Sequence, residues 1–141
     1  MVWVQSSTIS RALAAEVPRV EWPGRHRVIF VCGGRGYADR KRVFEVLDLL
    51  QAQQQIGMVI LGGAQGNDAL GLAWAQAWNI PVLTFSVNWD KYGRSAGPRR
   101  NAQMLKEGKP DLVVAFPGGR GTANMIEQAR KVGVEVMEIK A

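Results

Sequence analysis

Short apolar runs alternate with amphipathic stretches from residue 27 to the end of the chain. The apolar runs predict strands over residues 27–31, 58–61, 80–85, 111–116 and 134–139. The stretches between them predict helices over residues 39–55, from about 67 to 78, 98–106 and 123–132. Strands that are apolar on both faces and alternate with helices are typical of a parallel sheet covered on both sides. The expected fold is therefore α/β, a doubly wound parallel sheet of about five strands with helices on both faces.

Residues 1–26 lack this alternation, and their prolines and glycine interrupt regular structure. Trp3 and Trp22 are large apolar side chains that can cover a sheet edge or pack on a partner subunit. We therefore expect an N-terminal extension over residues 1–26 and one domain over residues 27–141.

Glycine turns follow three of the predicted strands. They read Gly33-Gly34-Arg35-Gly36, Gly62-Gly63-Ala64-Gln65-Gly66 and Pro117-Gly118-Gly119-Arg120-Gly121-Thr122. Right-handed crossovers bring all strand-to-helix turns to one edge of a parallel sheet, where ligands bind. The third turn opens a helix, so its backbone N–H groups suit a phosphate. The three turns predict one composite site.

Two carboxylates beside these turns have alternative interpretations. Asp39 stands where a dinucleotide-binding fingerprint would have its third glycine, so that motif is absent. It is either a helix N-cap or a ligand contact. Asp68 either caps a helix or accepts hydrogen bonds from a ribose or an amine. No Walker A sequence is present, which argues against ATPase or GTPase chemistry of that type.

A fourth candidate segment spans residues 88–101. Its length and its mixture of aromatic, basic and amide groups suit a loop that folds over a ligand. Arg99 and Arg100 follow Pro98 in the first turn of a predicted helix, where positive charge is unfavourable with the helix dipole. This placement favours a binding role, with an ion pair as the alternative.

The net charge of +6 is concentrated near the predicted site. Residues 33–42, 62–68, 88–100 and 117–122 together hold nine basic and three acidic residues, and the remaining chain is balanced. If these segments converge, they create a local positive field that attracts an anion. The alternative is a basic, solvated surface.

Several classes of site are disfavoured by composition. Cys32 is the one cysteine, so an internal disulfide or a cysteine cluster for metal is impossible within one chain. His26 is the one histidine and precedes the first strand, at the edge opposite the expected site. We expect no metal and no resident cofactor. No apolar run suits a membrane span and no signal peptide is visible, so a cytoplasmic protein without membrane contact is expected.

The turns in combination resemble the SLOG superfamily of Rossmann-like nucleotide-binding proteins, and most closely its YspA/YpsA-related branch. The resemblance runs from about residue 27 to residue 139. It rests on Gly33-Gly34-Arg35, Gly62-Gly63-Ala64-x-Gly66-x-Asp68, Trp89-x-x-Tyr92-Gly93, Ala96-Gly97-Pro98-x-Arg100-Asn101 and Pro117-Gly118-Gly119-x-Gly121-Thr122. It implies a Rossmann-like fold and a homodimer or larger homo-oligomer.

The superfamily also includes LOG phosphoribohydrolases, which cleave the N-glycosidic bond of nucleoside monophosphates. Their pattern is similar to P-G-G-x-G-T-x-x-E, and Met125 stands at the position of the catalytic glutamate. Glu127 lies about 200° further around a helix and does not substitute for it. This departure argues against hydrolysis of that type.

The sequence therefore predicts a module that binds a nucleotide or a nucleotide-derived phosphorylated ligand, with a sensor or signalling role. No catalytic residue is assigned. One alternative is an N-glycosidic hydrolase that uses Asp39, Asp68 or Asp90; another is nucleic-acid binding of the kind seen in the DNA-processing protein DprA. The predicted ligand-binding residues are Gly33, Gly34, Arg35, Gly62, Gly63, Asp68, Arg99, Arg100, Asn101, Pro117, Gly118, Gly119, Arg120, Gly121 and Thr122.

Overall fold

The computed structural model describes residues 26–62, 66–85 and 89–140. The predicted extension over residues 1–26 lies outside this part except for His26. Five parallel strands form one sheet in the order β3-β2-β1-β4-β5. The strands are β1 (Arg27–Cys32), β2 (Ile56–Leu61), β3 (Val82–Thr84), β4 (Leu112–Ala115) and β5 (Glu135–Glu138). The helices are α2 (Arg40–Gln53), α3 (Asn67–Ala77), α4 (Trp89–Tyr92), the 3₁₀ turn η2 (Gly93–Ser95), α5 (Ala96–Gly108) and α6 (Arg120–Lys131).

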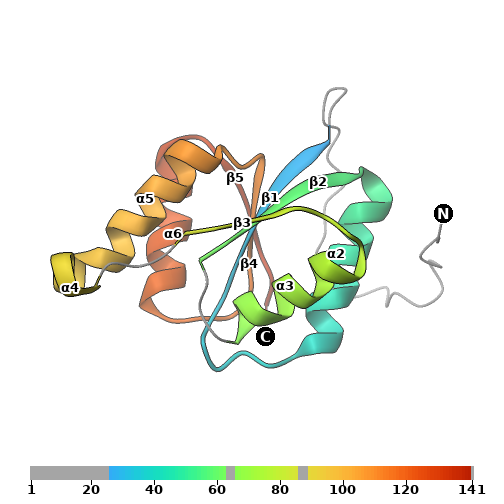
Figure 1. Ribbon diagram of the computed structural model, residues 1–141, viewed down its shortest axis with the longest axis horizontal. Helices are drawn as coiled ribbons and strands as arrows, with labels where there is room; N and C mark the ends of the chain where they lie inside the picture. The colour runs from blue at the N-terminus through green and yellow to red at the C-terminus, as the bar shows by residue number, and fades with distance from the viewer. Residues whose placement is uncertain (1–25, 63–65, 86–88, 141) are drawn as a thin grey trace.

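The central strand is β1, and the sheet extends from it on both sides. The chain first builds β2 and β3 on one side and then returns to build β4 and β5 on the other. Helices α2 and α3 pack together on one face of the sheet, and α5 and α6 pack together on the opposite face (Figure 1). The predicted α/β, doubly wound, Rossmann-like fold is confirmed. Strand order reverses between β1 and β4, where folds of this type bind ligands.

Alternate residues of β1 face the two helical layers. Ile29 and Val31 pack into the core beneath α2 and α3. Phe30 and Cys32 pack into the core beneath α5 and α6. All four are buried because a parallel strand with helices on both faces has no solvent-exposed side.

The third strand is shorter than predicted. We expected it over residues 80–85, but β3 spans Val82–Thr84 and pairs with β2 alone. The N–H of Ile80 donates to the Ala75 carbonyl at 2.9 Å, so this residue closes the end of α3 and does not begin the strand. The apolar Ile80 therefore belongs to the turn between α3 and β3.

Two helices begin earlier than predicted. The expected loop over residues 88–97 contains α4 and η2, and α5 begins at Ala96. Pro98 lies in its first turn, where a missing N–H costs no helical hydrogen bond. Helix α6 begins at Arg120, three residues before the predicted start, because Gly119 accepts the N–H of Ala123 at 3.0 Å. The second half of the third glycine turn is therefore the first turn of α6.

Candidate functional site

The first glycine turn lies against the third. The N–H of Gly34 donates to the Pro117 carbonyl at 2.9 Å. A Cβ on Gly34 would come within 3.2 Å of both the Gly118 Cα and the Pro117 oxygen. A side chain at Gly34 would push the two turns apart, so glycine lets the ends of β1 and β4 approach each other.

The second glycine turn lies against the first. Gly66 has a φ of +72°, which L-residues rarely adopt. A Cβ there would collide with the carbonyl of Arg35. The N–H of Asn67 donates to the Gly34 carbonyl at 3.3 Å. Gly63 and Gln65 lie outside the described residues, but the two ends of their turn are placed, and all three turns meet at one edge of the sheet.

A pocket of about 330 Å³ opens where the turns meet, between the carboxyl end of β1 and helices α5 and α6. Ten of the fifteen predicted ligand-binding residues line it. From the turns come Gly33, Gly34, Arg35, Gly62, Gly119 and Gly121. From the helices come Asp68, Arg100, Asn101 and Thr122.

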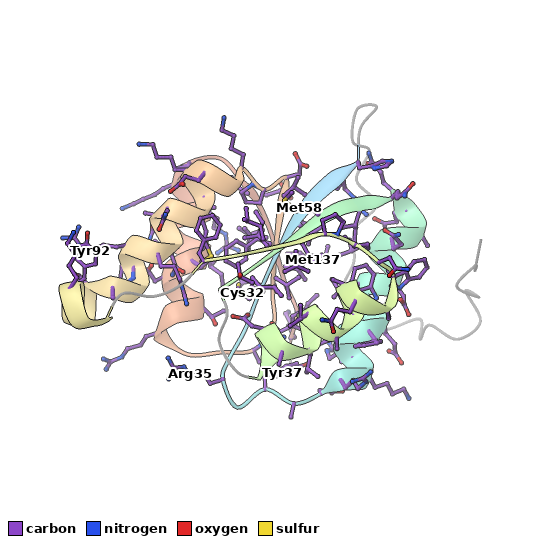
Figure 2. All side chains as sticks on the ribbon, viewed as in Figure 1. Cys32, Arg35, Tyr37, Met58, Tyr92 and Met137 are labelled. Atoms are coloured by element: carbon purple, nitrogen blue, oxygen red, sulfur yellow. The ribbon has the colours of Figure 1, made fainter. Side chains whose placement is uncertain are left out.

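Four other predicted residues do not line the pocket. Pro117 and Gly118 lie behind it, where they contact the first turn and Thr122. Arg120 is exposed at the start of α6. The Arg99 guanidinium lies over the Tyr92 ring, 4.4 Å from its centroid, and its Nε donates to the Ser95 hydroxyl at 3.1 Å. Figure 2 shows Tyr92, the last residue of α4, at the periphery and far from Cys32 and Arg35.

Charged groups of opposite sign meet at Gly62. The Arg100 Nη1 donates to the Gly62 carbonyl at 3.0 Å. A Cβ on Gly62 would lie 3.0 Å from the Arg100 Cζ and 3.2 Å from the Asp68 Oδ2. Burial lowers the pKa of Arg100, Asp68 opposes that shift, and the nearby Arg35 guanidinium adds to it. Two guanidinium groups therefore share this region with one carboxylate, and the local charge is positive.

The N-terminus of α6 forms the opposite wall. No acidic side chain lies in its first turn, and Gly119 offers no side-chain cap. The first N–H groups of a helix have no partner within the helix and carry its positive dipole end. Thr122 adds a hydroxyl, and its side chain is mostly buried. This wall can accept an anion through several donors at once.

Asn101 fixes α5 to α6. Its Nδ2 donates to the Gly121 carbonyl at 3.2 Å and to the Asn124 Oδ1 at 3.0 Å. Gln128 completes the connection, because its Nε2 donates to the Pro98 carbonyl at 3.0 Å and to the same Asn124 oxygen at 2.6 Å. These bonds set the distance between Arg100 and the start of α6.

Comparison with known proteins places this chain in a family. A model described as the YspA, cpYpsA-related SLOG family matches residues 27–92. The Gene 61 protein of Mycobacterium phage D29 is 31% identical over 119 residues, which cover 79% of this chain and 94% of the phage protein. The chain belongs to this SLOG family.

A solved structure is similar to the SLOG chain over part of its length. It is the phosphoribosylglycinamide formyltransferase of Coxiella burnetii in complex with CHES, at 18% identity and a TM-score of 0.39. The match covers 67% of the SLOG chain and 43% of the transferase, so this chain spans less than half of that protein. The assignment of the fold rests on the strand order itself.

Several pocket residues of the SLOG chain were missed by sequence reasoning. They are Phe30, Cys32, Gly97 and Met104. Alternation along β1 would have placed the first two on one face, and Gly97, Asn101 and Met104 share one side of α5 at a spacing of four and three residues. Met125, noted only as a departure from the LOG pattern, also lines the pocket and is 1% exposed.

The pocket of the SLOG chain is lined by two arginines, one carboxylate and one thiol among neutral groups. Burial, with Asp68 as a smaller cause and Arg100 in opposition, raises the pKa of the Cys32 thiol well above its usual range. Within the described residues, no three His, Cys, Asp or Glu side chains gather to hold a metal. No helix in residues 26–62, 66–85 and 89–140 is long and apolar enough to cross a membrane.

Proposed function

We propose that this protein binds a nucleotide or a nucleotide-derived phosphorylated ligand in the pocket between β1, α5 and α6, as a sensor or signalling component. The observation that carries the proposal is the glycine wall at the start of α6. Cβ atoms on Gly119 and Gly121 would meet no atom within 4 Å, although both residues line the pocket. Packing does not explain glycine at these positions, whereas close approach of a phosphate to the backbone does.

The arginines support an anionic ligand. Arg35 is exposed at the mouth, and Arg100 is half-buried beside it. The Nε of Arg100 is buried and has no hydrogen-bond partner within the part of the chain that the structure describes. Buried donors are normally satisfied, so a ligand oxygen or a water is expected near this group. The phosphate would bind the α6 N–H groups and the Thr122 hydroxyl, with both guanidinium groups on its other side.

The carboxylates favour binding over hydrolysis. Asp39 caps α2, because its Oδ1 accepts the N–H of Arg42 at 3.0 Å. The side chain of Asp90 lies outside the described part. Of the two candidates whose side chains are described, Asp68 lines the pocket, where it would accept hydrogen bonds from a ribose or an amine. Met125 also lines the pocket, with a side chain that transfers no proton.

Gly121→Ala tests the proposal, since the fold has room for the methyl group and the pocket wall would lose its close approach. Calorimetric titration with AMP, ADP-ribose and NAD should show binding to the wild-type protein and about tenfold or weaker binding to the variant. Melting temperature should stay equal or rise, because alanine favours a helix over glycine. Gly36→Ala is the matched control: its Cβ also meets open space, and Gly36 does not line the pocket. Absence of binding by the wild-type protein at millimolar ligand would refute the proposal.

A further inference from the structure

The first two residues of α3 contact two of the glycine turns. Asp68 approaches Gly62, with its Oδ2 3.2 Å from the place that a Cβ would take. Asn67 lies against Gly33, where a Cβ would come 2.6 Å from the Asn67 Cγ and 3.0 Å from its Oδ1. The backbones also meet, because the Asn67 N–H donates to the Gly34 carbonyl at 3.3 Å (Figure 1). The start of α3 is therefore packed against the first and the second turn.

The side-chain amide of Asn67 is buried without a hydrogen-bond partner. The residue is 0% exposed, and neither its Nδ2 nor its Oδ1 has a partner within the part of the chain that the structure describes. The amide does not cap its own helix, whose N-cap is Gly66. A buried donor and acceptor left unpaired raise the free energy of the folded protein, and such groups are normally satisfied. Neither packing nor helix capping explains why an amide stands here.

Neighbouring polar groups are placed differently. Asn101 is 2% exposed, and its Nδ2 has two hydrogen-bond acceptors. Asp68 has the Arg100 guanidinium as a neighbour of opposite charge. The Nε of Arg100 is buried and also unpaired among the described residues, but Arg100 lines the pocket, where a ligand oxygen can approach it. The amide of Asn67 is unpaired and does not line the pocket.

Asn67 reaches the pocket through the first glycine turn. Gly33, Gly34 and Arg35 of this turn line the pocket. Arg35 is exposed at the mouth, so an anion held by the start of α6 would attract its guanidinium. A shift of Arg35 moves the peptide groups of Gly33 and Gly34 relative to the amide that packs against them. A ligand can therefore supply, through this turn, the partners that the amide lacks.

We infer that Asn67 is a positioning residue for the ligand site: its amide stays unpaired in the free protein and bonds the peptide groups of the first glycine turn when a bound anion draws Arg35 toward α6. The inference rests on the proposed function, which supplies the anion. A ligand shifts a conformational equilibrium only by binding its two states differently. Because the amide is paired in the bound state alone, it lowers the stability of the free protein and raises the affinity for the ligand.

Matched alanine variants test the free protein. Asn67→Ala removes an unpaired amide and Asn101→Ala removes a bonded one, from residues of the same type and nearly the same burial. Asn101→Ala should lower the melting temperature by roughly 4–8 °C. Asn67→Ala should raise it or leave it within about 2 °C of the wild-type value. If both variants lower it equally, the Asn67 amide is already paired in the free protein, for instance by a water, and the inference is wrong.

Binding supplies the second readout, because a purely structural residue would not lower affinity while stability is kept. In calorimetric titrations, AMP, ADP-ribose and NAD should bind Asn67→Ala about fivefold or more weakly than the wild-type protein. Asn67→Ser carries a hydroxyl that can donate and accept close to Gly33, and it should bind within about threefold of the wild-type protein.

Two results of these titrations would overturn the inference and leave the phosphate site at α6 intact. One is wild-type affinity in Asn67→Ala. The other is equally weak binding by Asn67→Ser and Asn67→Ala, which would assign the loss to side-chain volume and not to hydrogen bonding. If none of the three ligands binds the wild-type protein, the proposed function itself fails, and the inference fails with it.

Discussion

Arg100 and Asp68 should depend on each other for stability. Both approach the same point beside Gly62, and the distances from that point place the Arg100 Cζ and the Asp68 Oδ2 no more than about 6 Å apart. At about 6 Å, unit charges attract by about 0.7 kcal/mol in bulk water and by about 3 kcal/mol at an effective dielectric constant of about 20. Asp68 is buried and Arg100 is half-buried, so the upper part of this range applies.

A double-mutant cycle measures this coupling. Arg100→Met removes the charge and the hydrogen bond to Gly62 but keeps an extended side chain, and Asp68→Asn removes the charge but keeps the shape. Urea unfolding of both single variants and the double variant should give a coupling free energy of about 1–3 kcal/mol. Arg100→Met alone should lower the melting temperature by roughly 4–8 °C, since its lost hydrogen bond to a carbonyl adds to the lost attraction.

The exposed pair of Arg130 and Glu138 is the control for this cycle. The Arg130 Nη2 and the Glu138 Oε2 are 2.7 Å apart, a shorter separation than the limit given above for Arg100 and Asp68. The two side chains are, however, 57% and 51% exposed. Solvent screens such a pair, so the cycle of Arg130→Met with Glu138→Gln should yield below about 1 kcal/mol. If the Arg100 and Asp68 cycle gives below about 0.5 kcal/mol, the two groups act as independent solvated charges and the reasoning from burial is wrong.

Two further measurements test the second glycine turn and the burial of the Cys32 thiol. Gly66→Ala should lower the free energy of unfolding by about 2 kcal/mol or more, because φ is +72° and the new Cβ would meet the Arg35 carbonyl. Urea unfolding measures this change. A loss of stability within about 0.5 kcal/mol would contradict the placement of the second turn. Cys32 should react with an alkylating reagent at pH 8 at least about a hundredfold more slowly in the native protein than in urea, because burial raises its pKa and the thiolate is the reactive form. The same shift means that stability falls as pH rises above about 9, where the unfolded chain ionises this thiol first. Equal labelling in both states would show that the thiol is not buried.

The order of strands and helices could be predicted from the sequence because the strand pattern and the helix pattern are both local. The run over residues 111–116 and the helical spacing over residues 39–55 each point to one kind of structure without any tertiary information. The starts of α5 and α6 could not be predicted in this way. Pro98 and Gly119 are common both in loops and in first turns, and the difference depends on which carbonyl the following N–H groups reach.

The residues of the site also divide into those that could be predicted from the sequence and those that could not. Residues of the turns could be assigned to the pocket because parallel topology brings every such turn to one edge. Arg99 and Arg100 are adjacent and share the same chemistry, yet one lies over Tyr92 and the other enters the pocket. The side that each takes follows from the exact start of α5, which the sequence leaves open. Phe30 and Met104 were missed for another reason: an apolar residue of a buried strand or helix is indistinguishable from ordinary core until the pocket is seen.

The glycines of the three turns have two different physical reasons, and the difference bears on function. At Gly34 and Gly66 a Cβ would meet the backbone of a neighbouring turn, and at Gly33 and Gly62 it would meet helix side chains within about 3.2 Å, so packing is enough to explain glycine at all four. Their presence would be expected in a protein with this arrangement and no ligand at all. Gly119 and Gly121 face open space. The case for a phosphate therefore does not grow with the number of glycine turns; it rests on two residues at the start of α6, and Gly121→Ala examines it where packing offers no competing explanation.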